Sequence, residues 1–201
     1  MSMVLLLTEL KELLESSKAR IVITGSFTAA TNMKGVADLD NLQGQKKTTV
    51  FAPNDIVYAH SKLLQYMWAK KFSQTVAPGV VVCMYDPGLC ETNNEFYHFL
   101  RRTTKCAYPV VKWVMRTRDP LAGASIAFWA CDSPDAAGIN GKALDWGTFG
   151  SPKFRALVPM EQFPTYKMTM PSVADDTQVE QLWKVTEEIR QDIVAKGQGK
   201  W

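Results

Sequence analysis

A tyrosine and a lysine four residues apart, Tyr58 and Lys62 in the segment YAHSK, are the pair in this sequence best suited to chemistry. On a helix, this spacing places both side chains on one face. A lysine ammonium near a phenol favours the phenolate and lowers the pKa of a tyrosine, which can then exchange a proton with a carbonyl or alcohol oxygen near neutral pH. Ser26, at the end of the apolar run RIVITGS, has a hydroxyl that could hold the same oxygen. Together the three residues suit proton transfer coupled to the movement of a hydride.

Each of these signals has an ordinary structural interpretation. A Tyr-x-x-x-Lys pair is common on solvated helix faces, and a serine that ends a strand is usually a turn or helix-cap residue. Pro87 and Gly88, which follow the second apolar run GVVVCMY, are by themselves the residues of a turn. The order of the signals along the chain is what favours the chemical interpretation.

Length and composition indicate one globular domain, residues 1–201. Of the 201 residues, 46% are hydrophobic and 21% charged, and the net charge is only +3 with no long basic tract. We therefore expect no nucleic-acid partner. The four cysteines form no C-x-x-C pair and only two histidines are present, which argues against a zinc site. We expect reduced, mostly buried thiols and an intracellular, cytoplasmic protein, with membrane association left open.

The N-terminal segment has the spacing of an amphipathic helix rather than a signal peptide. It has no basic region ahead of the apolar residues, and charged residues interrupt the apolar run early. Its leucines recur at helical spacing, at Leu6, Leu10, Leu13 and Leu14. No run of about 18 apolar residues occurs anywhere in the chain, so we expect no transmembrane segment.

The remaining pattern alternates helices and strands. Short β-branched runs predict strands at 20–26 and 79–85, and a third short strand is expected at 141–147. Helices are expected at 55–74, 96–117 with a break at Pro109, 119–134 and 178–196, the last with a buried stripe of Val179, Leu182, Trp183, Thr186, Ile189 and Ile193. Residues 28–49 are expected to form a long loop and 151–176 an irregular segment. This order predicts an α/β fold with a parallel sheet and right-handed crossovers.

Five motifs in this order resemble the short-chain dehydrogenase/reductase family, in particular its retinol dehydrogenase and protochlorophyllide reductase-like branch. RIVITGS resembles the strand that carries the active-site serine, with Ser26 in that place and Gly25 replacing a first serine. YAHSK resembles the Y-x-x-x-K motif, which implies Tyr58 as catalytic acid/base and Lys62 as its partner and ribose ligand.

Three further segments extend the resemblance. DPGLCET resembles the H-P-G-x-x-x-T segment, with Asp86 in place of the histidine. It implies nicotinamide-binding positions at Pro87, Gly88, Leu89 and Thr92. The segment 119–142 resembles the P-x-x-G-A helix and the V-S-G-K stretch that follows it, and LWKVTEEI resembles the closing helix.

The glycine-rich T-G-x-x-x-G-x-G turn and the N-N-A-G strand of the family have no counterpart in this sequence. The chain therefore looks like the C-terminal part of such a protein, without the N-terminal cofactor-binding half. This implies a partial Rossmann-like, doubly wound parallel sheet, with part of the catalytic core at 1–150 and an irregular segment and C-terminal helix at 151–201.

The resemblance implies an NAD- or NADP-dependent oxidoreductase that interconverts an alcohol and a carbonyl on a small apolar substrate. The apolar stretches FYHFL and AYPVVKWVM lie where the family has its substrate lid. The alternative is a non-catalytic homologue that acts as a binding or dimerisation module. We expect the 201-residue chain alone to be poorly soluble or a homo-oligomer, and to bind neither NAD(H) nor NADP(H).

Overall fold

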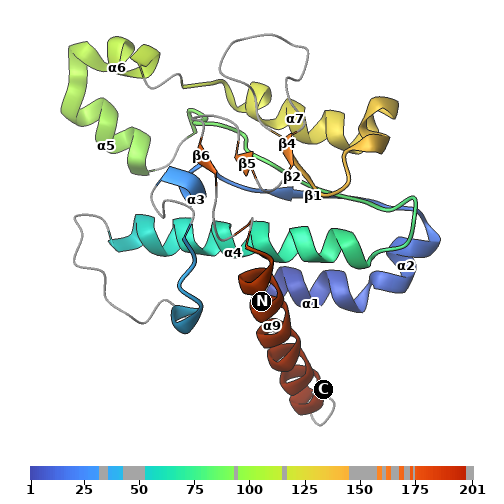
Figure 1. The fold of residues 1–201 in the computed structure, drawn as a ribbon. Helices are drawn as coiled ribbons and strands as arrows, with labels where there is room; N and C mark the ends of the chain where they lie inside the picture. The colour runs from blue at the N-terminus through green and yellow to red at the C-terminus, as the bar shows by residue number, and fades with distance from the viewer. Residues whose placement is uncertain are drawn as a thin grey trace.

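The protein is a mixed α/β structure, mostly helical, built around a small parallel sheet (Figure 1). The computed structural model describes residues 1–31, 36–42, 53–92, 95–114, 117–144, 158–159, 162–163, 168–169, 173 and 175–197. Helices cover both faces of the sheet, as the alternation of apolar runs and helical patterns predicts (Figure 1).

Three strands run parallel: β1 (Arg20–Thr24), β2 (Val81–Tyr85) and β3 (Lys142–Leu144). The two-residue strand β4 (Val158–Pro159) pairs antiparallel with β3, and the order across the sheet is β1-β2-β3-β4. A second small sheet joins β5 (Gln162–Phe163) and β6 (Met168–Thr169). The predicted strands are confirmed at 20–24, 81–85 and 142–144, and residues 145–147 of the third prediction lie outside the described residues. The short strands β4–β6 lie in a segment that we expected to be irregular.

Alternating side chains of β2 build two separate cores. Val82 and Met84 belong to the larger core beneath the sheet, and Val81 and Cys83 belong to a smaller core on the other face. Because successive side chains of a strand point to opposite faces, an unbroken apolar run is what a strand covered on both faces requires.

The larger core lies against α1 (Ser2–Glu9), α2 (Lys11–Ser16), α4 (Pro53–Thr75) and α9 (Asp176–Gly197). Trp68 stacks on Phe72 with 4.7 Å between ring centroids and on Trp183 of α9 with 5.6 Å, so aromatic packing joins α9 to α4. The predicted loop after β1 contains two short helices, α3 (Thr28–Thr31) and the 3₁₀ helix η1 (Leu39–Asn41).

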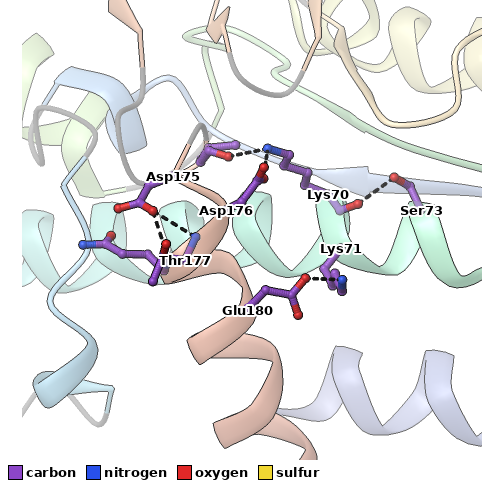
Figure 2. A network of polar contacts seen from close by, with 9 residues as sticks. Lys70, Lys71, Ser73, Asp175, Asp176, Thr177 and Glu180 are labelled. Carbon is purple, nitrogen blue, oxygen red and sulfur yellow. Dashed lines mark hydrogen bonds and ion pairs between the residues drawn. The ribbon is translucent and has the colours of Figure 1, made fainter.

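Polar contacts fix the N-terminus of α9 on α4 (Figure 2). The ammonium of Lys70, buried in α4, donates to the main-chain oxygen of Val173 at 2.9 Å and to the Asp176 carboxylate at 3.0 Å. The Asp175 carboxylate accepts from the main-chain N–H of Thr177 at 2.9 Å, which caps the helix. The long final helix is thus held at its first turn by hydrogen bonds and along its side by aromatic packing.

On the opposite side of the sheet lie α5 (Glu95–Thr104), the 3₁₀ helix η2 (Lys105–Ala107), α6 (Tyr108–Val114), α7 (Pro120–Asp132) and the 3₁₀ helix η3 (Pro134–Gly138) (Figure 1). The break predicted at Pro109 is wrong by a few residues. The chain turns at Lys105, whose φ is +38°, and Pro109 lies in the first turn of α6. Proline is tolerated there because first-turn N–H groups have no partner within the helix.

Three further expectations differ from the structure. The N-terminal segment forms two helices with a break at Leu10 rather than one helix. All four cysteines are free, but Cys106 and Cys131 are exposed, so the thiols are not mostly buried. Ile193, expected in the buried stripe of the last helix, is 40% exposed because that end of α9 extends beyond the core.

Candidate functional site

The carboxyl ends of β1 and β2 lie side by side, which brings the residues that follow them to one edge of the sheet. Thr24 is in register with Tyr85, and the Gly25 N–H donates to the main-chain oxygen of Tyr85 at 2.7 Å. The Thr24 hydroxyl donates to the Tyr85 hydroxyl at 3.0 Å. Ligands of open parallel sheets bind beyond this kind of edge, so it is where the candidate site is built.

Lys62 links α4 to this edge. Its ammonium donates to the main-chain oxygen of Thr24 at 2.9 Å and lies 5.6 Å from the centroid of the Tyr58 ring. The i, i+4 spacing therefore brings the two side chains together, as predicted. Burial lowers the pKa of Lys62, because desolvation disfavours the charged form. Tyr58 itself is 47% exposed, so its phenol is open to a ligand approaching from solvent.

Ser26 is buried and makes its contacts within its own turn. Its hydroxyl oxygen accepts from the Thr28 hydroxyl at 2.9 Å, and its main-chain oxygen accepts from the Ala29 N–H at 3.2 Å. These are the contacts of a residue that caps a short helix, here α3. Among the hydrogen bonds of the described residues, none joins Ser26 to Tyr58 or Lys62. The serine thus lies at the end of β1, two residues after Thr24, and is not hydrogen-bonded to the tyrosine–lysine pair.

Gly25 is required by the packing beneath the site. A Cβ atom at this position would lie 2.2 Å from the hydroxyl oxygen and 2.7 Å from Cζ of Tyr66, whose side chain is fully buried in α4. No side chain fits without displacing Tyr66 or the end of β1. The glycine at position 25 is therefore explained by the tyrosine beside it.

The turn after β2 holds the predicted nicotinamide-binding residues. The buried Asp86 carboxylate accepts from the Gly88 N–H at 2.9 Å, and the φ of Gly88 is +72°, a region that favours glycine. Leu89 is half-buried and its main-chain oxygen accepts from the Arg118 N–H at 2.8 Å. Pro87 is half-buried and Thr92 is exposed. The turn is well fixed, and its outer residues are open to solvent.

Sequence reasoning overlooked Glu91, the centre of a charged cluster beside this turn. Its carboxylate contacts Lys112, Arg101 at 2.5 Å and the Tyr108 hydroxyl at 2.8 Å. Hydrogen bonds lower the pKa of Glu91 to about 2, with the largest effect from Lys112, followed by Arg101 and then Tyr108. The motif treats this position as variable, so no local signal marked it. The cluster joins α5 and α6 to the end of β2.

His60 was also overlooked as a site residue. It is buried in α4, its Nε2 accepts from the Asp38 N–H at 3.2 Å, and burial lowers its pKa. It borders a cavity of about 370 Å³ between α1, α4 and α9, whose other walls include Val57, Leu64, Trp68, Leu182 and Ile189. Tyr58 and Lys62 are not among the lining residues, so this cavity is separate from the strand-end site.

Two classes of site are not found in the part of the chain that the structure describes. No group of three or more His, Cys, Asp or Glu side chains there could hold a metal ion. None of the described helices is both long enough and apolar enough to cross a bilayer. A comparison with protein-family models and with curated proteins gave no match to this chain.

Proposed function

We propose that the protein is an NAD(P)-dependent oxidoreductase of the short-chain dehydrogenase/reductase type, with a Rossmann-like sheet. It would interconvert an alcohol and a carbonyl on an apolar substrate, with Tyr58 as acid/base. The observation that carries this proposal is the position of Lys62, whose ammonium lies over the Tyr58 ring and donates to the oxygen of Thr24. This contact fixes α4, which carries the YAHSK segment, on the end of β1 that precedes Ser26. A Tyr-x-x-x-Lys pair that is merely solvated on a helix surface does not need such a contact.

The residues of the chain would act on the substrate oxygen. In reduction, the Tyr58 hydroxyl donates its proton to the carbonyl oxygen as the C–O bond gains single-bond character; in oxidation, the phenolate takes the proton from the alcohol. The Lys62 ammonium stabilises the phenolate electrostatically. The Ser26 hydroxyl would donate to the same oxygen and orient it, which requires rotation away from its turn contacts.

When bound, a nicotinamide dinucleotide supplies or accepts the hydride. The residues present fit its nicotinamide end. Lys62 has further ammonium protons for ribose hydroxyls, and the turn at Pro87, Gly88 and Leu89, with exposed Thr92, presents main-chain and hydroxyl groups for an amide. No residue of this chain is assigned to the pyrophosphate or the adenosine.

The proposal is tested by joining the chain to the N-terminal cofactor-binding half of a family member. The assay follows the formation of reduced nicotinamide cofactor with apolar alcohols and its consumption with apolar aldehydes. Tyr58→Phe should abolish turnover and leave cofactor affinity nearly unchanged, because it removes only the proton donor. Lys62→Ala should damage both turnover and cofactor affinity. Ser26→Ala should lower the rate by about 10²- to 10⁴-fold, the range for loss of a positioned polar catalytic group.

A matched control separates chemistry from folding. Lys71→Ala removes an ammonium from α4, the helix that carries Lys62, and this ammonium pairs with Glu180 of α9. The variant should retain turnover. A Tyr58→Phe protein with most of its activity would show that this tyrosine is not the acid/base.

A second function, pairing with another chain, is favoured by the open edge of β1. Among the described strands, β1 has a neighbour on one side only, namely β2. An apolar cavity of about 360 Å³ lies along β1, and its lining includes Met3, Leu6, Ile21 and Ile23. Leu6 is 58% exposed. An apolar strand with unpaired main-chain groups readily adds a strand from another chain.

Sedimentation velocity and calorimetry on the 201-residue chain discriminate between the two functions. If β1 mediates pairing, Leu6→Glu should dissociate the assembly. The control Leu121→Glu, at a position 80% exposed on α7 across the sheet, should leave the assembly unchanged. Micromolar binding of NAD(H) or NADP(H) would support the oxidoreductase, and would show that the chain builds a phosphate site after all.

A further inference from the structure

The helix pair α5–α6 exposes large apolar side chains to solvent. Phe99 is 64% exposed on α5, and Val110 and Trp113 are 61% and 80% exposed on α6. Val110 and Trp113 are three residues apart on one helix, so they lie on the same face. Single exposed apolar residues are normal, but three on two neighbouring short helices require an explanation.

The inward side of the same helices accounts for how they are held. Tyr97 is 2% exposed, and Arg101, Tyr108 and Lys112 all contact the Glu91 carboxylate beside β2. The pair is therefore fixed to the domain through buried and charged residues. Phe99, Val110 and Trp113 contribute little to that attachment, because most of their surface is in water.

The charge of this segment indicates the kind of partner. Residues 91–118 contain six Lys or Arg against two Glu, a net charge of +4, whereas the whole chain carries +3. Arg102 and Lys105 are exposed and lie outside the Glu91 cluster. By contrast, the exposed apolar residues Leu121 and Phe128 of α7 lie in a segment, 119–135, with three Asp and no Lys or Arg.

The geometry points to α5–α6 as a surface that binds an anionic lipid bilayer. An interfacial helix inserts aromatic and aliphatic side chains at the level of the headgroups, while basic side chains contact anionic lipids. Trp and Tyr favour this interface because they combine an apolar body with a polar group. Phe99, Val110 and Trp113 would insert, and Arg102 and Lys105 would contact the headgroups. This inference does not depend on the oxidoreductase proposal.

Flotation with vesicles tests the inference on the 201-residue chain, because vesicle-bound protein rises in a density gradient while self-associated protein does not. We expect the chain to float with vesicles of phosphatidylcholine and phosphatidylglycerol, and not with phosphatidylcholine alone. The combined change Arg102→Gln and Lys105→Gln should lower the partition coefficient more than tenfold, at about fivefold for each basic residue near the surface. Higher salt should have the same effect.

Paired substitutions locate the surface. Val110→Ser and Trp113→Ser should each lower the partition coefficient about fivefold or more. Leu13→Ser is the control, because Leu13 is 62% exposed, like Val110, but lies in α2 on the opposite side of the sheet. Circular dichroism checks that all variants remain folded.

Three outcomes would overturn the inference. The first is that the chain stays at the bottom of the gradient with anionic vesicles, and the second is that it floats equally well with neutral vesicles. The third is that Val110→Ser and Trp113→Ser dissociate an oligomer without changing flotation, which would make this surface a protein interface.

Discussion

Replacing Gly25 by alanine should destabilise the protein strongly, because a side chain at this position would overlap Tyr66. The added Cβ would lie 2.2 Å from the Tyr66 hydroxyl oxygen and 2.7 Å from Cζ. Optimal separations between non-bonded heavy atoms are about 3.5 to 4.0 Å, so the ring would have to move by more than about 1 Å. Tyr66 is fully buried in the larger core, where a ring has no free space to move into.

The expected cost follows from this overlap. Overpacking of a well-packed core typically costs about 1 to 3 kcal/mol, and the short distance places Gly25→Ala in the upper half of that range. For a domain of this size, about 2 to 3 kcal/mol corresponds to a loss of about 4 to 12 °C in the unfolding temperature. A shift of the main chain at Gly25 to relieve this overlap would also strain the hydrogen bond from the Gly25 N–H to the main-chain oxygen of Tyr85.

Thermal unfolding followed by circular dichroism at low protein concentration measures the effect. Gly138→Ala is the matched control, because a Cβ there meets nothing within 4 Å, and it should change stability by less than about 0.5 kcal/mol. In the double variant Gly25→Ala/Tyr66→Leu, the smaller side chain should relieve the overlap, giving a coupling energy of about 0.5 to 3 kcal/mol. Equal stability of Gly25→Ala and Gly138→Ala would refute the packing argument.

Three further predictions concern the charged and thiol groups. Lys70→Met should lower the free energy of unfolding by about 1 to 3 kcal/mol in a urea titration, because it leaves the buried Val173 carbonyl without this donor. The control Lys71→Met, at an exposed ion pair, should lower it by less than about 1 kcal/mol. The folded-state pKa of Glu91 is lowered from 4.5 to about 2, so its stabilising contribution is complete above pH 4.5 and is lost as the pH falls to about 2; Glu91→Gln should flatten the unfolding temperature against pH in that window. Burial raises the pKa of Cys83 to about 12, so this thiol should react with a thiol reagent only after unfolding, while the exposed Cys106 reacts in the folded protein and Cys106→Ser removes that fast phase.

Local sequence patterns were sufficient to predict the central elements. β1 and β2 follow from β-branched runs, and α4 from a long segment without a breaker, because these signals depend on residues close together in the chain. The break in 96–117 was misplaced because Pro109 ends a helix only when it is not in the first turn, and the sequence does not say where that turn is.

The contacts that define the candidate site depend on distant residues and could not be predicted in detail. The packing of Gly25 against Tyr66 and the hydrogen bond from Lys62 to Thr24 each depend on residues about 40 positions apart in the sequence. The Glu91 cluster likewise needs α5 and α6 to fold back on the end of β2. The exposure of Cys106 has the same origin, since the tendency of cysteine to be buried does not determine its position on a particular helix.

Two single-residue departures from the motifs that the sequence resembles, Gly25 and Asp86, have structural explanations that are compatible with the proposed chemistry. At position 25, Tyr66 occupies the space that a serine side chain would need, and Ser26 still follows the strand. At position 86, the buried carboxylate accepts from the Gly88 N–H, so it stabilises the positive φ of the turn on which the proposed nicotinamide-binding residues lie. Neither change removes a group that we propose to transfer a proton, because Tyr58 and Lys62 come from α4 and Lys62 contacts the strand end at Thr24. The motif departures therefore alter the support of the site, and the proposed acid/base pair does not depend on them.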